Sequence, residues 1–438
     1  MRDQITRLGG WLAMLFSTVA DELARDTGFI VRERGFSGAE FVRTLVFGWL
    51  ENTKATVQDF GQELNVTDSA LQQRMTPKSV ALMRGMLEKA LGYLMTGVPH
   101  DTKLTTRFRK IFVEDCTSIH LLESWRDDFP GCGGAEVGQG AAGMKILVRT
   151  EVKSGEISVV QWAAGREHDL NLSREAGDPP AGSLYLVDLG FWCPERFDLL
   201  KKQGAEWISR VPAGATLSVD GQPREDVTDF LKRQKTDRVD QHVLLGEKEF
   251  SVRLVAVRCP THIAAERKRK LRKKYKKRGR QPSQRQLIAC EWLVFVTSLC
   301  EDEFSLEELW TLYRVRWQIE LVFKRWKSLL DVDKSRARTN GFRQLTELYA
   351  KLLGCLVTHW CGLLRAGLLT KLSWYQILKR AKRAIGSLGE FWDDRNPSQS
   401  VIVIVEKLVK RLDRLKPRSK RKKKPGTMEL LETPELVF

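Results

Sequence analysis

Five short apolar segments follow one another between residues 110 and 212, and they constrain the fold more than any other feature of the chain. They have the length and the content of β-branched and aromatic residues that are typical of strands. A helical segment from Pro194 to Gln203 separates the last two. The order β-β-β and then β-α-β predicts a mixed sheet covered by helices, which is an α/β fold. The five segments are 110–122, 143–153, 156–165, 182–192 and 206–212.

Two aspartates lie in strongly apolar surroundings within this series of strands. Asp115 is in the middle of the first segment, and Asp188 ends the apolar run of the fourth. A buried carboxylate costs several kcal/mol unless it is paired with a charge or bound to a metal ion. The predicted topology lets both carboxylates lie side by side at one edge of the sheet. Each aspartate taken alone is also typical of a cap or a turn.

Residues 1–105 have helical periodicity and are expected to form a helical N-terminal domain, which is a DNA-binding domain if the pattern described next is a helix-turn-helix. Within them, residues 56–76 contain two short amphipathic segments around a turn at residues 64–66, with Thr67 or Asp68 as the cap of the second. This pattern fits a helix-turn-helix, and it fits an ordinary helical hairpin equally well. In a helix-turn-helix, the residues in position to read a groove are Ser69, Gln72, Gln73 and Arg74.

A predicted insertion interrupts the sheet pattern between residues 212 and 290. It contains a hairpin-like segment over residues 240–258, with its turn at Gly246. A run of basic residues over 267–280 follows, which we interpret as a cationic loop. The insertion is therefore expected to be mostly β.

The chain after the insertion is predicted to be mainly helical. Residues 290–299 add one strand, and residues 305–330 form one long helix that starts with a capping box of Ser305 and Glu308. Helices return over residues 341–415. We expect three domains: 1–105, a catalytic core with its insertion over 106–370, and a helical C-terminal region with a basic tail over 371–438.

The positive charge of the chain is concentrated in two short runs. Lys and Arg number 73 against 55 Asp and Glu, a net charge of +18. Residues 267–280 contain eleven bases and residues 416–424 contain seven, without an acid, so the rest of the chain is formally neutral. A neutral body with two dense cationic runs suits a polyanion such as nucleic acid. Either run alone also fits a solvated segment.

Four polar residues recur along one stripe of the predicted helix over 305–330. Tyr313, Arg316, Glu320 and Lys327 have offsets of 0, 3, 7 and 14, which bring them to one side of a helix at about 100° per residue. Arg316 and Lys327 are suited to clamp phosphates, and Tyr313 to donate a hydrogen bond to one. The ordinary alternative is a surface pair such as Glu320 with Lys324.

Asp115, Asp188 and Glu320 together provide three carboxylates. Carboxylate oxygens are the ligands that Mg²⁺ prefers and that Mn²⁺ also accepts. Two such ions about 3.5 to 4 Å apart activate an attacking hydroxyl and stabilise the leaving oxygen of a phosphodiester. The three acids therefore predict a metal-dependent site for cutting nucleic acid.

The spacing Tyr313-x2-Arg316-x3-Glu320-x6-Lys327 resembles the YREK signature of bacterial insertion-sequence transposases of the DDE, cut-and-paste type. The resemblance extends over residues 50–370. It implies a ribonuclease-H-like catalytic core with a β-rich insertion before the last acidic helix, flanked by helical N- and C-terminal regions.

The resemblance also implies roles for individual residues. It assigns Asp115, Asp188 and Glu320 as the catalytic and metal-binding acids. Arg210 resembles a family arginine near the active site, and Trp292 resembles a tryptophan that stacks on a base flipped from the transposon end. Some members carry a basic residue after the second aspartate where this chain has "LGFW". The basic run 267–280 has no counterpart in the signature.

Together these observations predict a Mg²⁺-dependent DNA transposase that cleaves at terminal inverted repeats and transfers the 3′ ends to target DNA, as a homodimer on paired ends. A structure-specific nuclease on the same core and a DNA-binding protein without catalysis are the alternatives. Eight cysteines without a CxxC pair predict reduced thiols. Because no apolar run reaches the roughly 18 residues of a membrane span, a cytoplasmic protein is expected.

Overall fold

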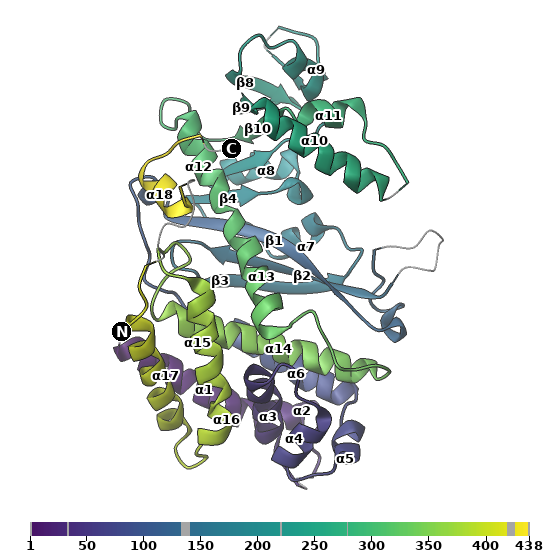
Figure 1. Ribbon diagram of the computed structural model, residues 1–438, viewed down its shortest axis with the longest axis vertical. Coiled ribbons are helices and arrows are strands. Elements are labelled where there is room, and N and C mark those ends of the chain that lie inside the picture. Colours follow the sequence, from purple (N-terminus) through teal and green to yellow (C-terminus); the bar gives the residue numbers. More distant parts are fainter. Residues whose placement is uncertain are drawn as a thin grey trace. The chain divides into compact units, whose positions relative to one another are not determined.

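The computed structural model describes residues 2–32, 35–132, 141–219, 221–277, 279–417 and 425–436 (Figure 1). Most of the basic tail, residues 418–424, lies outside them. The chain is a mixed α/β protein, as its sequence predicts. It divides into two compact units that do not follow chain order. The first unit consists of residues 1–100, 116–167 and 318–420, and the second of residues 101–115, 168–317 and 421–438.

The N-terminal helices of the first unit agree with the helical periodicity of residues 1–105. Helix α3 starts at a capping box of Ser37 and Glu40, and almost all of its residues are buried. A π-helical turn, Leu15–Val19, joins the first two helices. The helices are α1 Arg2–Met14, α2 Ala20–Asp26, α3 Gly38–Glu51, α4 Val57–Glu63, α5 Asp68–Gln73 and α6 Pro77–Leu91.

Helices α4 and α5 form the predicted pair of short helices. Asn65 has a φ of 54° in the turn between them, a left-handed conformation that asparagine tolerates. Thr67 caps α5 by accepting a hydrogen bond from the Ala70 amide at 3.2 Å. The Arg74 guanidinium donates to the Phe29 carbonyl at 3.2 Å and lies over the Phe29 ring, so this side chain packs within the unit. A role of this pair in reading DNA stays a prediction.

The second set of helices in the first unit surrounds a buried central helix, α14. All but its first three residues are buried, and it packs against α3, α6 and α15. Two antiparallel strands, β2 Gly143–Glu151 and β3 Ile157–Ala164, complete the unit. The helices are α13 Trp317–Leu330, α14 Gly341–Leu363, α15 Trp374–Gly386, α16 Leu388–Phe391 and α17 Pro397–Asp413. Among the described residues, no helix is long and apolar enough to cross a membrane.

A buried ion pair fixes the loop that follows α13. Lys351 and Glu347, one turn apart on α14, are 2.7 Å apart with 3% and 1% of their side chains exposed. The Lys351 ammonium also donates to the carbonyl of Lys334 at 2.7 Å, and Glu347 accepts from the Ser335 hydroxyl at 2.7 Å. Both charges are thus bonded to backbone or side chains of residues 331–337.

The second unit is built on a sheet with the strand order β1-β4-β5-β10-β9-β8-β6-β7. The first three strands are parallel to one another, and the remaining neighbours are antiparallel. The core strands are almost wholly buried, which explains their continuous apolar runs. The strands are β1 Lys110–His120, β4 Ser183–Val187, β5 Glu206–Arg210, β6 Thr216–Ser218, β7 Glu225–Asp226, β8 Arg238–Leu245, β9 Phe250–Arg258 and β10 Trp292–Thr297.

The insertion is only partly β, which corrects the prediction. The hairpin of β8 and β9 forms around Gly246, whose φ of 71° suits glycine. Residues 267–276 of the basic run, however, belong to a helix of 16 residues and not to a loop. The other helices of the second unit are α7 Asp169–Glu175, α8 Pro194–Lys202, α9 Val227–Lys232, α10 Thr261–Lys276, α11 Gln284–Ala289, α12 Leu306–Val315 and α18 Thr427–Glu432.

The predicted helix over residues 305–330 is interrupted, which is a second correction. Its capping box is confirmed, because the Ser305 amide donates to Glu308 at 2.8 Å and the Glu308 amide to Ser305 at 3.2 Å. Helix α12 ends at Val315 and α13 begins at Trp317. Arg316 therefore lies between two helices rather than within one.

Candidate active site

Asp115 and Asp188 are brought together by the register of two parallel strands. Strands β1 and β4 pair so that Val113 lies opposite Leu186, and each aspartate is two residues further along its strand. Residues two apart point to the same face of a sheet. The two carboxylates therefore lie side by side, as the strand order predicted. We call the edge of the sheet at which Asp115 and Asp188 lie the carboxylate edge.

Arg316 lies between these two carboxylates. Its Nη1 atom is 3.8 Å from Asp115 Oδ2, and its Nη2 atom is 3.8 Å from Asp188 Oδ2. The arginine side chain is 12% exposed, against 25% and 35% for the aspartates. One guanidinium thus balances part of the negative charge of two carboxylates that water can still reach.

Tyr313 contacts the same site from the last turn of α12. Its hydroxyl donates to the Val187 carbonyl at 3.3 Å and lies 3.5 Å from Asp188 Oδ1. The ring packs against Phe295 of β10, with centroids 4.6 Å apart. Burial raises the pKa of Tyr313, and the charge of Asp188 raises it further, while Arg316 and Arg210 oppose these effects. The phenol therefore stays protonated and acts as a hydrogen-bond donor.

Arg210 ends β5, the neighbour of β4. Ser209 lies opposite Val187 in this parallel pair, so Arg210 is level with Asp188 along the sheet. Its charge also acts on the Tyr313 hydroxyl. The structure thus brings Arg210 to the carboxylate edge, and its role in an active site stays a prediction.

Trp292 does not present an open ring. It is 1% exposed, and the Arg258 guanidinium lies 4.2 Å from its ring centroid. A base can stack on this indole only after Arg258 moves away, so the base-stacking role stays a prediction that the packed state does not favour.

Glu320 and Lys327 lie on α13, which belongs to the first unit apart from its first residue. Lys327 Nζ lies 3.5 Å from the Ser118 carbonyl, and Glu320 is half-buried. The structure thus brings together five of the predicted residues: Asp115, Asp188, Arg210, Tyr313 and Arg316. Within the described residues, no group of three or more His, Cys, Asp and Glu side chains is arranged to hold a metal ion.

A buried polar network on the other face of β1 and β4 was not foreseen. Glu114 is fully buried and accepts a hydrogen bond from the Tyr185 hydroxyl at 2.8 Å. Ser173 lies 3.2 Å from the same hydroxyl, and the Arg196 guanidinium lies over the Tyr185 ring and pairs with Asp178 at 2.8 Å. The alternation of side chains along a strand could have revealed this network, because Glu114 and its neighbour Asp115 must point to opposite faces of the sheet.

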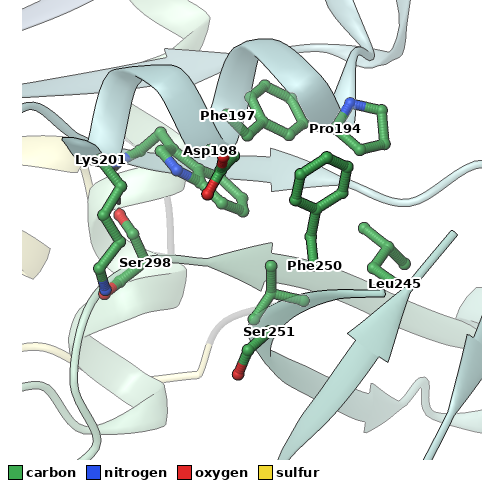
Figure 2. A pocket seen from close by; sticks show the side chains of 10 residues that line it. Pro194, Phe197, Asp198, Lys201, Leu245, Phe250, Ser251 and Ser298 are labelled. Carbon is green, nitrogen blue, oxygen red and sulfur yellow. Dashed lines mark hydrogen bonds between the residues drawn. The ribbon is translucent and has the colours of Figure 1, made fainter. Parts of the chain in front are cut away.

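A small pocket of the second unit lies elsewhere. Figure 2 shows the rings of Phe197 and Phe250 lining it, with Lys201 and Ser298 at one end. Lys201 donates to the Ser298 carbonyl at 2.9 Å. Trp207, which also lines the pocket, is at the start of β5, whereas the carboxylate edge is at its end. The pocket is therefore not part of the candidate site.

The carboxylate edge combines two carboxylates with one guanidinium. Asp115 and Asp188 offer hard oxygen ligands that suit a divalent cation, and their partial exposure leaves them accessible to one. The Arg316 guanidinium beside them has the geometry to bind a phosphate. These side chains therefore fit a divalent ion.

Comparison with known proteins names the family. Residues 106–352 match the model of the transposase DDE domain. The match covers more than half of the chain, and the chain belongs to this family. Membership implies dependence on a divalent metal ion.

Several transposases of insertion sequences are similar to this chain. The transposase for insertion sequence element IS421 from Escherichia coli is 34% identical over 332 residues, which cover 73% of this chain and 84% of the relative. The transposase for IS231F from Bacillus thuringiensis subsp. israelensis is 26% identical over 363 residues, covering 76% and 75%. The putative transposase InsL for IS186A from Escherichia coli (strain K12) is 34% identical over 240 residues, covering 52% and 62%.

Proposed function

We propose that this protein is a Mg²⁺-dependent DNA transposase that cleaves at terminal inverted repeats and transfers the freed 3′ ends to target DNA. The observation that carries the proposal is the pair of in-register carboxylates, Asp115 and Asp188, beside Arg316 in a chain of the transposase DDE family. We propose further that β1, β4 and β5 belong to a ribonuclease-H-like core.

Each residue of the site then has a chemical task. Asp115, Asp188 and Glu320 would hold Mg²⁺ or Mn²⁺, which supplies a nucleophilic hydroxide and stabilises the leaving oxygen. Arg316 and Lys327 bind phosphate oxygens through charge-assisted hydrogen bonds. Tyr313 keeps its proton, and its hydroxyl lies 3.5 Å from Asp188 Oδ1, where it can turn from the Val187 carbonyl to donate to that carboxylate. In this proposal the four residues Tyr313, Arg316, Glu320 and Lys327 act as the YREK signature.

The experiment compares Asp115→Asn, Asp188→Asn and Glu320→Gln with the unchanged protein. The probe is a duplex that carries one terminal repeat of the element, taken from the DNA beside the coding sequence. We expect each variant to lose cleavage in Mg²⁺ by at least about 100-fold, because charge stabilisation of the transition state is lost, while binding to the duplex persists. Near-normal cleavage by any one variant would remove that residue from the site.

Asp198→Asn serves as the matched control. Asp198 is on α8, pairs with Lys202 at 2.5 Å and lines the pocket away from the carboxylate edge, so its loss should leave cleavage unchanged. A pre-cut end incubated with plasmid then tests strand transfer. Joined products identify a transposase, and cleavage without joining identifies the nuclease alternative. Cross-linking on paired ends tests the proposed homodimer.

A further inference from the structure

Helix α10 presents a dense positive face to solvent. Arg269, Arg272, Lys273 and Lys276 are exposed and follow one another at positions i, i+3, i+4 and i+7, so they lie on one side of the helix. Only one acid, Glu266, lies on α10, and it pairs with Lys270 at 2.7 Å. Like charges one turn apart repel and destabilise an isolated helix. An anionic partner along this face would relieve that repulsion.

The opposite side of α10 is fixed to the second unit by specific contacts. The Arg267 guanidinium donates to the Trp292 carbonyl and to Cys259 Sγ, both at 2.9 Å. Lys268 pairs with Glu291 at 2.5 Å. The Tyr275 hydroxyl accepts a hydrogen bond from Gln286 of α11 at 2.6 Å, and Figure 1 shows α10 beside α11. These contacts fix α10 to the rest of the second unit, so its exposed basic face has a defined orientation.

The anchor of α10 lies at the carboxylate edge. Strand β10 is antiparallel to β5 with Phe295 opposite Arg210, so Trp292 extends beyond the end of β5. That end is level with the end of β4 and with Asp188. Two strand spacings of about 4.8 Å separate β10 from β4. The Trp292 carbonyl, which accepts a hydrogen bond from Arg267, thus lies at the same end of the strands as the Asp115 and Asp188 carboxylates.

We infer that the exposed face of α10 binds the phosphate backbone of duplex DNA whose scissile bond lies at the carboxylate edge. This inference rests on the proposed function, and it assigns the role that the basic run lacked in the family signature. From residue 269 to residue 276 the helix rises about 10 Å, over which a duplex carries about six phosphate charges. The contacts are to phosphates and carry no base sequence.

The test replaces Arg269, Arg272, Lys273 and Lys276 by glutamine together. Because each phosphate contact contributes a slope of about −0.9 in log K against log salt, loss of four contacts flattens the slope by about 3 to 4 units, and loss of half of them by about 2. Binding to the end duplex is measured from low to physiological salt. A flattening of about 2 units or more supports the inference.

The control replaces four exposed bases of the first unit, Lys407, Lys410, Arg411 and Arg414 at the end of α17, by glutamine. Circular dichroism and the melting temperature verify that both variants fold. A second arm measures capture of a supercoiled plasmid by the enzyme already bound to a cut end. If only binding of the end duplex is weakened, α10 contacts the donor duplex. If capture of the plasmid is weakened, α10 contacts the target DNA.

The inference is overturned by two results together. The α10 variant flattens the salt dependence of end binding no more than the control variant does, and it reduces plasmid capture no more than the control variant does. Mg²⁺-dependent cleavage by the unchanged protein is followed in parallel. Cleavage with an unchanged salt slope leaves the proposed function standing and removes the role of α10. A flattened slope without any cleavage leaves α10 as a DNA-binding face and removes the proposed function.

Discussion

Replacing Arg316 by glutamine should change metal binding and catalysis in opposite directions. In the structure the Arg316 guanidinium lies 3.8 Å from a carboxylate oxygen of both Asp115 and Asp188. In the proposed function it would therefore compete with a divalent ion for the same negative charge. Its removal should let Mg²⁺ or Mn²⁺ bind more tightly, while cleavage is lost because the phosphate has lost a clamp.

The size of the effect follows from the distances. Two unit charges 3.8 Å apart attract by about 4 kcal/mol at an effective dielectric constant of about 20. Because the aspartates are 25% and 35% exposed, solvent screening reduces each pair to about 1 kcal/mol or less. The variant should lose about 1 to 2 kcal/mol of competition with the ion, which corresponds to a 5- to 30-fold lower midpoint for divalent-ion binding.

The assay is the melting temperature of the protein titrated with Mn²⁺ in the absence of DNA, followed by cleavage of the end duplex. Arg314→Gln is the matched control, because Arg314 is in the last turn of α12, two residues before Arg316, and its guanidinium lies 5.9 Å from the Trp310 ring. A variant Arg316→Gln that needs as much Mn²⁺ as the unchanged protein, or more, would refute the electrostatic reasoning. Normal cleavage by this variant would refute the clamp.

Three further predictions concern buried groups. Burial lowers the pKa of His359 from 6.5 to about 4. The neutral buried imidazole therefore contributes about 3 kcal/mol to the free energy of unfolding above pH 6.5, and this contribution should be lost as the pH falls from 6.5 to 4. His359→Gln should flatten this pH dependence, measured by urea unfolding. Lys351→Met should cost about 3 to 5 kcal/mol because Glu347 stays buried without its partner; a double variant with Glu347→Gln that recovers nothing would contradict this. Arg258→Ala should uncover Trp292 and increase the quenching of a 2-aminopurine near the cut end, and Trp292→Ala should abolish it. A lower melting temperature with equal loss of both cleavage steps would instead identify Trp292 as a core residue.

The sheet and its two aspartates could be predicted because a few strong signals agree. The apolar runs around Asp115 and Asp188 are long enough to identify two strands that are buried on both faces. A carboxylate in such a run is costly to bury unless it is paired with a charge or bound to a metal ion, which limits where it can lie. Parallel pairing then brings the two aspartates together, and no detail of side-chain packing is needed for this step.

Other features depend on information that local patterns do not contain. The basic run was interpreted as a cationic loop, but Ile263, Leu271 and Tyr275 recur at multiples of four residues and are half-buried along one side of α10. Lysine and arginine also have high helix propensity. The interruption at Arg316 leaves no trace in the periodicity, because residues on both sides continue the same amphipathic pattern.

The pairing of β5 with β10 has a consequence for how the insertion could be gained or lost. These neighbours are antiparallel, with Arg210 opposite Phe295, so about eighty residues occupy the position of a hairpin turn. A short turn that joins Arg210 to Trp292 would preserve the three parallel strands and the path into α12. It would also strip β9 from β10 and leave an unprotected edge strand, which is a template for aggregation. Any shortened descendant would therefore need a charged residue, a proline or a bulge on β10 before it could exist as a soluble protein.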